Sequence, residues 1–167
     1  MCQLRKCVMY VMNTNQRCIQ SICDIADSVH EGQYTKTVSL VLDIPQEYNQ
    51  HVGVFIINES NLVDYINKFN PVILRNTVTS GQKYLPKNST TINFGASKGL
   101  TFNRVLIITT DKQLKFLKGI RTVFDEDKTD EAKNKFYVAL TRARYSIGIL
   151  VSDKDAVYFP NSLWINN

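Results

Sequence analysis

The sequence predicts an α/β fold in which a mostly parallel sheet carries helices on both faces. Two observations support this prediction. Segments with apolar residues at helical spacing alternate along the chain with short apolar segments. The short segments are continuous apolar runs rather than alternations of apolar and polar residues, which is typical of parallel strands buried on both faces. The chain contains no internal repeat and no low-complexity segment.

The first part of the chain sets up this alternation. Strands are expected at residues 7–12, 37–42 and 51–57, where apolar and β-branched side chains follow one another. A polar break at residues 13–17 separates the first strand from a helix. The inner face of that helix carries Ile19, Ile22, Cys23, Ala26 and Val29.

The next helix is expected to begin at Asn58 or Ser60, because both are good N-cap residues. Its apolar side chains are Leu62, Val63, Ile66 and Phe69. The Asn-Pro pair at residues 70–71 ends it, since the residue before a proline disfavours helical backbone. Residues 72–74 then form a short strand, and the polar residues 77–89 form a loop.

Two further strands precede the last helix. They are expected at residues 91–94 and 104–109, with a tight turn at residues 95–99 between them. The second of these two has the clearest pattern of a buried strand in the chain. A short helix around residues 113–120 and an acidic linker at residues 125–130 follow.

Residues 135–144 are expected to end a helix that leads directly into a buried strand at residues 145–151. The apolar stripe of this helix comprises Ala132, Phe136, Ala139 or Leu140, and Ala143. Arg142 and Arg144 then fall in its last turn, where the helix dipole favours cations. An arginine there is held rigidly at the edge of the sheet, where α/β proteins bind ligands. The simpler alternative is that both arginines are solvated surface charges.

The composition narrows the class of protein. A chain of 167 residues with 44% apolar residues is expected to form one domain with a hydrophobic core large enough to stabilise it. A net charge of +5 permits a polyanionic partner without requiring one. No apolar run approaches the roughly 20 residues that span a bilayer, and the first residues lack the apolar core of a signal peptide. The expectation is a cytoplasmic protein without a membrane partner.

The four cysteines all lie in the first quarter of the chain, at Cys2, Cys7, Cys18 and Cys23. Four thiols match the ligand count of a structural zinc site, but their spacing does not match the two-residue knuckles that usually build one. No metal site is therefore expected, and reduced, mostly buried thiols are the default.

The segment Tyr-Val-Ala-Leu-Thr-Arg-Ala-Arg at residues 137–144 resembles the "YVAxTRA+" motif of UvrD/Rep-type superfamily 1 helicases. In that family the arginine reaches the γ-phosphate of ATP, which is bound between two RecA-like domains. The resemblance implies a catalytic role for Arg142 and a nucleotide contact for Thr141.

A second segment, residues 91–107, resembles the family motif "T-h-H-x-S-K-G-L-E-F-D-x-V-h-h". A turn between strands that carries Ser97 and Lys98 exposes backbone N–H groups, a hydroxyl and a cation, which suits a phosphate. The alternative is a solvated turn in which Gly99 is needed only for its backbone conformation. The resemblance implies DNA contacts for Ser97 and Lys98 and nucleotide contacts for Gly99 and Thr101.

This second segment departs from the family pattern at two positions. Gly95 stands where the family usually has His, and Thr101 stands where it usually has the Glu that bonds the nucleotide sugar. A subgroup of UvrD-like helicases, often encoded near nuclease-type defence proteins, carries a closer "NFGxSKGLTFDRVLI" version. This similarity implies a nuclease as a further partner.

A third segment, residues 15–28, is similar to the family's "N-Y-R-S-x-x-x-I-x-x-h-A-N-x". Arg17 is expected at the start of a helix, where a cation is unfavourable by up to about 1 kcal/mol unless an anion lies nearby. A solvated arginine is the alternative. The resemblance implies a catalytic Arg17 and a nucleotide-binding Gln16, although Gln16 replaces the Tyr that stacks on the adenine.

The chain lacks the sequence Gly-x-x-x-x-Gly-Lys-Ser/Thr that cradles phosphates and holds Mg²⁺ in P-loop proteins. No Asp-Glu pair follows an apolar strand either. Residues 1–167 are therefore expected to be a single C-terminal RecA-like (P-loop NTPase-type) helicase domain that lacks the Walker A half and the large accessory insertion.

The resemblance implies that this domain supplies arginines to ATP and Mg²⁺ held by a missing N-terminal RecA-like domain, and that it lines part of a single-stranded DNA groove. Activity of the chain alone is not expected. One alternative is a non-catalytic remnant that binds nucleic acid or protein. Another is an unrelated doubly wound domain that binds a different ligand.

Overall fold

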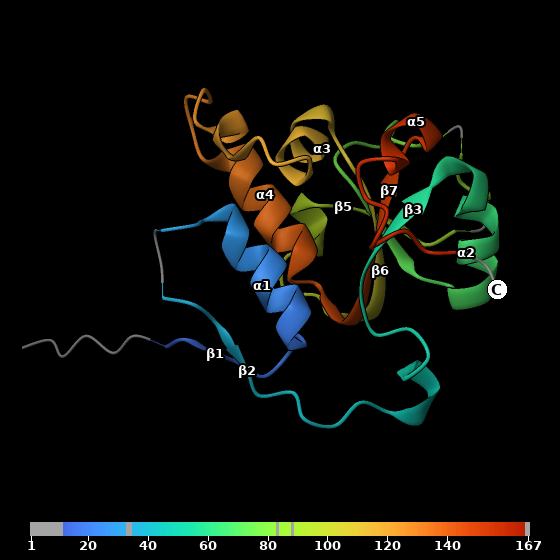
Figure 1. Ribbon diagram of the computed structural model, residues 1–167, viewed down its shortest axis with the longest axis horizontal. Helices are drawn as coiled ribbons and strands as arrows, with labels where there is room; N and C mark the ends of the chain where they lie inside the picture. The colour runs from blue at the N-terminus through green and yellow to red at the C-terminus, as the bar shows by residue number, and fades with distance from the viewer. Residues whose placement is uncertain (1–11, 33–34, 83, 88, 166–167) are drawn as a thin grey trace, which may run out of the picture.

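The computed structural model describes residues 12–32, 35–82, 84–87 and 89–165. At its centre is a sheet of five strands in the order β3-β7-β6-β4-β5, and every neighbouring pair is parallel (Figure 1). The strands are β3 (Gly53–Asn58), β4 (Val72–Arg75), β5 (Thr91–Asn93), β6 (Phe102–Ile108) and β7 (Ala143–Val151). The predicted α/β class with a parallel sheet is confirmed, and the arrangement is consistent with a RecA-like domain.

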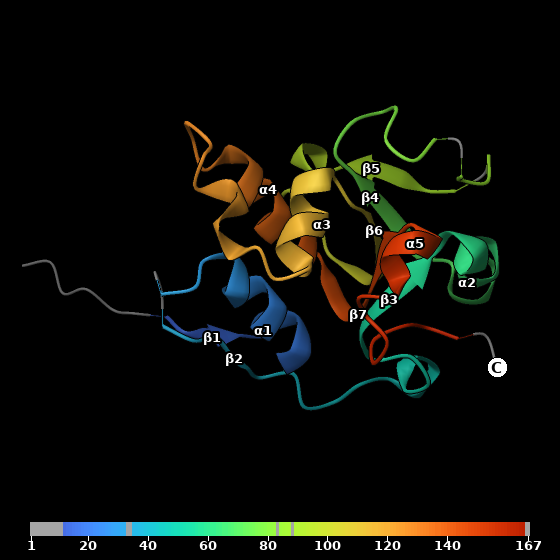
Figure 2. The ribbon, with the colours of Figure 1, turned by 45° about the horizontal axis from the view of Figure 1, so that its top comes forward.

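Helices cover both faces of the sheet (Figure 2). On one face lie α1 (Gln20–Val29), α3 (Asp111–Leu117) and α4 (Glu131–Leu140). On the other face lies α2 (Leu62–Phe69). A short helix, α5 (Asp153–Ala156), follows β7. Four short 3₁₀ helices lie in the connections: η1 (Gln46–Tyr48), η2 (Glu59–Asn61), η3 (Gly95–Ser97) and η4 (Arg121–Phe124).

The central strands bury side chains on both faces. In β6, Val105 and Ile107 pack with α1 and α4, whereas Leu106 and Ile108 pack with α2. All four side chains are buried. This double burial explains why the strand sequences are continuous apolar runs. In the described part of the chain, no helix has both the length and the apolar character needed to cross a membrane.

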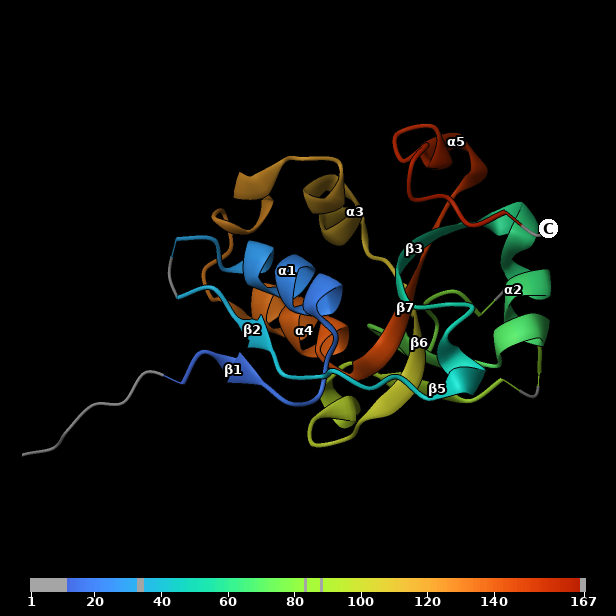
Figure 3. The same cartoon turned by 60° about the horizontal axis from the view of Figure 1, so that its bottom comes forward.

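The segment predicted as a strand at residues 37–42 does not join the central sheet. Only Val38–Ser39 forms a strand, β2, and it pairs with β1 (Thr14–Asn15) in a separate parallel pair beside α1 (Figure 3). Leu40 and Leu42 are 48% and 89% exposed, whereas Val41 between them is partly buried and packs against the core. The strand predicted at residues 7–12 lies mostly outside the described residues.

Two predicted helix ends also differ from the structure. Helix α4 ends at Leu140, so Arg142 lies in the connection and Arg144 lies in β7, not in the last helical turn. The predicted N-caps Asn58 and Ser60 precede α2 by one 3₁₀ turn, and their side chains donate hydrogen bonds to the carboxylate of Asp153 instead.

Candidate functional site

Three connections meet at the amino ends of β6 and β7. Residues 15–19 enter α1, residues 98–101 enter β6, and residues 141–142 enter β7. The Ile19 N–H donates to the Arg144 carbonyl at 3.0 Å, and the Phe102 N–H donates to the Arg142 carbonyl at 2.9 Å. The fold therefore brings all three predicted motifs together. They lie at the amino ends of the strands, whereas ligands of open α/β sheets generally bind at the carboxyl ends.

The connection that carries Arg17 is fixed by local hydrogen bonds. The side-chain oxygen of Asn15 accepts hydrogen bonds from the backbone N–H groups of Arg17 and Cys18, at 2.7 and 2.9 Å. The Cys18 carbonyl accepts a hydrogen bond from the Ser39 hydroxyl at 2.7 Å. The Arg17 backbone therefore has a defined position two residues before Ile19, the N-cap of α1.

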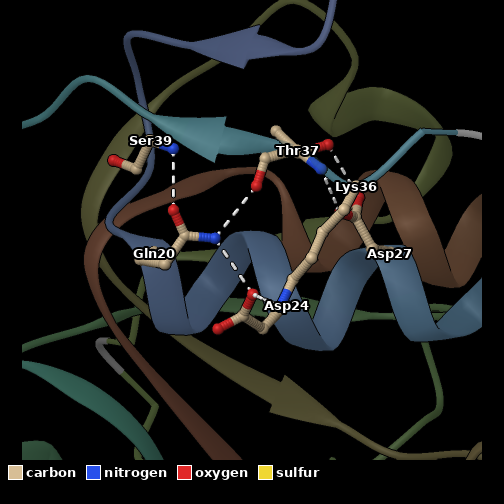
Figure 4. A network of polar contacts seen from close by, with 6 residues as sticks. All are labelled: Gln20, Asp24, Asp27, Lys36, Thr37 and Ser39. Atoms are coloured by element: carbon tan, nitrogen blue, oxygen red, sulfur yellow. Dashed lines mark hydrogen bonds and ion pairs between the residues drawn. The ribbon is translucent and has the colours of Figure 1, made fainter.

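A polar network ties α1 to the segment that contains β2 (Figure 4). The Gln20 amide donates to the Thr37 carbonyl and accepts from the Ser39 N–H, at 2.9 and 2.8 Å. About two turns further along α1, the Asp27 carboxylate accepts from the N–H and the hydroxyl of Thr37, at 2.6 and 2.8 Å. These bonds explain why residues 37–39 lie against α1 without burying an apolar face.

Arg142 is buried, and its guanidinium is bound within the domain. Its nitrogens donate to the carbonyls of Val138 and Leu100, each at 3.0 Å, and to the Thr141 hydroxyl at 3.2 Å. The side chain is only 8% exposed. Burial, and secondarily the positive charge of Arg17, lower the Arg142 pKa. The guanidinium thus joins α4 to the connection that precedes β6.

Arg17 is only half-buried and is bound more loosely. One guanidinium nitrogen donates to the Thr141 carbonyl at 3.5 Å, at the limit of a hydrogen bond. The same carbonyl accepts a weak hydrogen bond from the Cys18 thiol at 3.7 Å. Burial raises the Cys18 pKa, and the charges of Arg17, Arg142 and Arg144 oppose this effect. Three guanidinium groups therefore lie close to one buried thiol.

A polar depression of about 580 Å³ opens beside these groups. Its lining residues are Thr14, Asn15, Gln16, Arg17, Thr101, Asn103 and Arg144. Among the residues that the structure describes, its lining includes two guanidinium groups and no carboxylate. The depression unites the predicted residues Gln16, Arg17 and Thr101. It adds Arg144, the last residue of the "YVAxTRA+" segment, to which the sequence analysis assigned no contact.

The predicted DNA-binding residues lie away from this depression. The Ser97 side chain is fully buried, and its hydroxyl donates to the Phe94 carbonyl at 2.7 Å within the turn. Lys98 is exposed and lines a different depression, of about 640 Å³, next to α4. Gly99 adopts a φ of +80°, a conformation that favours glycine, so its place in the turn has a backbone reason.

The described residues hold no group of His, Cys, Asp or Glu side chains suited to a metal ion. Cys18 and Cys23 are free and buried, as expected, and burial raises the pKa of Cys23 to about 12. Cys2 and Cys7 lie outside the described residues.

The fold and the depression define a parallel α/β domain with a basic site between three connections. The family model of the UvrD-like helicase C-terminal domain matches residues 90–154. This segment contains the whole of the second motif and of the "YVAxTRA+" motif, so the resemblance to that family is confirmed there. The Arg17 segment lies outside the match. A comparison with curated protein sequences gave no match.

Solved helicase structures are similar to the chain at low identity. The helicase nsp10 of PRRSV is 20% identical with a TM-score of 0.44, over 82% of this chain and 23% of nsp10. The C-terminal domain of a possible DNA helicase from Lactobacillus plantarum WCFS1 is 11% identical with a TM-score of 0.48, over 82% of this chain and 87% of that domain. The chain thus spans less than a quarter of the length of nsp10.

Proposed function

We propose that this chain is the C-terminal motor domain of an ATP-dependent DNA helicase or translocase. One observation supports this proposal most directly: Gln16, Arg17 and Thr101, from motifs far apart in the sequence, line one depression to which the described part of the chain contributes no carboxylate. In the proposed enzyme, an N-terminal RecA-like domain holds ATP and Mg²⁺ and presents the phosphates to this depression. The cleft between the two domains is then the ATP site.

The arginines in this proposal have different tasks. Arg17 has one long hydrogen bond within the domain, so its guanidinium is available to neutralise charge on the terminal phosphate. An arginine in this role typically contributes about 10³–10⁵-fold to turnover. Arg142 is held by Val138, Leu100 and Thr141, so any contact with ATP requires it to exchange these hydrogen bonds for the phosphate.

Nucleic acid is the second ligand of the proposed motor. Lys98 is exposed on the turn between β5 and β6, where a single-stranded DNA backbone can reach its ammonium group. Ser97 supports this turn through its bond to Phe94. Binding through backbone phosphates must weaken as the salt concentration rises. A nuclease remains a proposed further partner, to be tested by co-purification.

The test is ATP hydrolysis with and without single-stranded DNA, by the chain alone and after mixing with an upstream domain that carries a Walker loop. We expect turnover only in the mixture, stimulated by DNA. Arg17→Ala should reduce it by about 10³-fold or more. Arg142→Ala should also nearly abolish it, with folding checked by circular dichroism at the assay temperature. Wild-type-like turnover in either variant would contradict the assignment.

One observation favours a second function, a non-catalytic module that binds nucleic acid or protein. Gln16 and Thr101 stand where the family has residues that contact the nucleotide. In this case the mixture has no ATPase activity, and the chain alone binds single-stranded DNA with a steep dependence on salt.

A further inference from the structure

The short parallel pair of β1 and β2 has polar side chains towards α1 and exposed apolar side chains, which is the reverse of the central sheet. The hydroxyls of Thr37 and Ser39 donate to α1 and to the residue before its N-cap, at 2.8 and 2.7 Å. Successive side chains of a strand point to opposite faces, so those of Val38 and Leu40 point away from α1. Both residues are 48% exposed, and Leu42 beyond them is 89% exposed. The apolar run here therefore exposes three of its side chains.

The edge of β2 that faces α1 is closed by a side chain. The Gln20 amide donates to the Thr37 carbonyl and accepts from the Ser39 N–H, which are the two backbone groups that a further strand would use (Figure 4). The other edge of β2 is paired with β1. The exposed apolar face of the pair, and not an edge of β2, is thus the part that a partner can contact.

This exposed face borders the polar depression. Thr14 is the β1 residue that pairs with Val38, and both Thr14 and Gln16 line the depression. Leu40 is joined to the residue between them, because its N–H donates to the Asn15 carbonyl at 2.7 Å. A domain that closes the depression therefore also reaches Val38 and Leu40.

We propose that the β1–β2 face, which comprises Met12, Val38, Leu40 and Leu42, is a docking surface for the upstream RecA-like domain of the same polypeptide. Neighbouring exposed apolar side chains mark interaction surfaces, and Met12 is 88% exposed as well. The chain enters β1 through Met12, so an upstream domain is attached next to this face.

The size of the β1–β2 face indicates a tethered partner. Four side chains offer at most roughly 600 Å², less than the about 800 Å² per partner of a stable complex between separate chains. Two domains joined in one polypeptide have an effective concentration on the order of mM, so a smaller contact is sufficient. This inference rests on the proposed function and adds a contact surface outside the proposed ATP site.

The test is an NMR titration of the labelled whole chain with the upstream domain that carries a Walker loop, without nucleotide. We expect amide shifts at Val38, Ser39 and Leu40 in the wild type. Val38→Gln and Leu40→Gln should each weaken binding about fivefold or more, because apolar side chains that anchor an interface typically contribute this much. The affinity should change little with salt, since an apolar contact is not screened.

Val63→Gln is the matched control, because it changes the same residue type at 51% exposure on α2, away from the β1–β2 face. It should change the affinity by less than about twofold. The two valine variants and Leu40→Gln should keep the melting temperature of the chain alone within about 2 °C of the wild type, because they replace exposed side chains. A clearly lower melting temperature in Val38→Gln than in Val63→Gln would mean that Val38 stabilises the domain itself, which contradicts a docking role.

Other results would also overturn the inference. Wild-type affinity in the double variant Val38→Gln/Leu40→Gln would do so, as would the absence of binding up to about 1 mM upstream domain. Self-association of the chain alone that is lost in Leu40→Gln would assign the face to a second copy instead.

The two proposals can fail separately. DNA-stimulated ATPase activity in the mixture, together with wild-type affinity in the double variant, removes only this inference. Docking through Val38 and Leu40 without ATPase activity in the mixture removes only the motor function.

Discussion

His51 should make the stability of this domain depend on pH in the range between 4 and 7. Its imidazole is 2% exposed and is stacked between the rings of Phe55 and Phe69, with ring-centre distances of 4.0 and 3.9 Å. Its Nδ1 lies 3.1 Å from the Ser146 hydroxyl, whereas its Nε2 has no hydrogen-bond partner among the described residues. A charged imidazolium would be poorly solvated in this position.

Burial, together with smaller contributions from the positive charges of Arg104 and Lys68, lowers the His51 pKa from 6.5 to about 4. Below pH 6.5 the unfolded chain therefore binds a proton that the folded chain does not bind. Stability must then fall as the pH falls from 6.5 towards 4. The full effect is about 3 kcal/mol, and about 2 kcal/mol of it should be lost at pH 5.

Urea unfolding at pH 7.5 and pH 5.0 measures this loss directly. In His51→Phe the aromatic stack is retained and the titrating group is removed, so the difference between the two pH values should shrink by about 2 kcal/mol. His30→Gln, which removes the other histidine of the chain, should leave the difference in place. A wild-type difference below about 0.5 kcal/mol, or an equal difference in His51→Phe, would refute the argument.

Two further predictions concern packing and the link between α1 and β2. A Cβ atom at Gly148 would lie 2.7 Å from the Tyr65 hydroxyl, so Gly148→Ala should destabilise the domain by about 1–3 kcal/mol in urea unfolding. The control is Gly95→Ala, because a Cβ atom there meets no atom within 4 Å. This control should change the free energy of unfolding by less than about 0.5 kcal/mol. Asp27→Ala removes both hydrogen bonds to Thr37 and should cost about 1–2 kcal/mol. Equal stability of the Gly148 and Gly95 variants, or no loss in the Asp27 variant, would contradict these arguments.

The sequence predicts the central strands well, because a strand that is buried on both faces has a continuous run of apolar residues. The strands predicted at residues 104–109 and 145–151 carry the uninterrupted runs Val-Leu-Ile-Ile at 105–108 and Ile-Gly-Ile-Leu-Val at 147–151, and in the structure they are neighbours in the sheet. The run at residues 37–42 has a similar composition, but its place depends on polar contacts with Gln20 and Asp27. Local composition cannot show such long-range contacts, so the predicted core strand was wrong there.

The site is predicted only in part for a similar reason. The family resemblance singles out Arg17 and Arg142, and in the structure their segments are in contact. Which guanidinium is left exposed depends on where α4 ends. Because the helix stops at Leu140 rather than continuing to residue 144, Arg142 turns into the domain and Arg144 enters a strand at the edge of the depression. A shift of a few residues in a helix end thus decides which of the two guanidinium groups is exposed.

The two ends of the sheet differ in how their polar groups are satisfied, and this difference explains where a ligand is expected. At the carboxyl ends of β3 and β7, the Asp153 carboxylate accepts hydrogen bonds from Asn58 and Ser60. The Thr109 hydroxyl there donates to the Leu150 carbonyl at 2.8 Å. The charges and hydroxyls that these bonds involve therefore already have partners within the domain. At the amino ends of β6 and β7, no carboxylate of the described residues lines the depression that Arg17 and Arg144 share, so electrostatics favours an anion at that end. In the proposed motor, we therefore expect the partner domain to approach the amino ends of these strands.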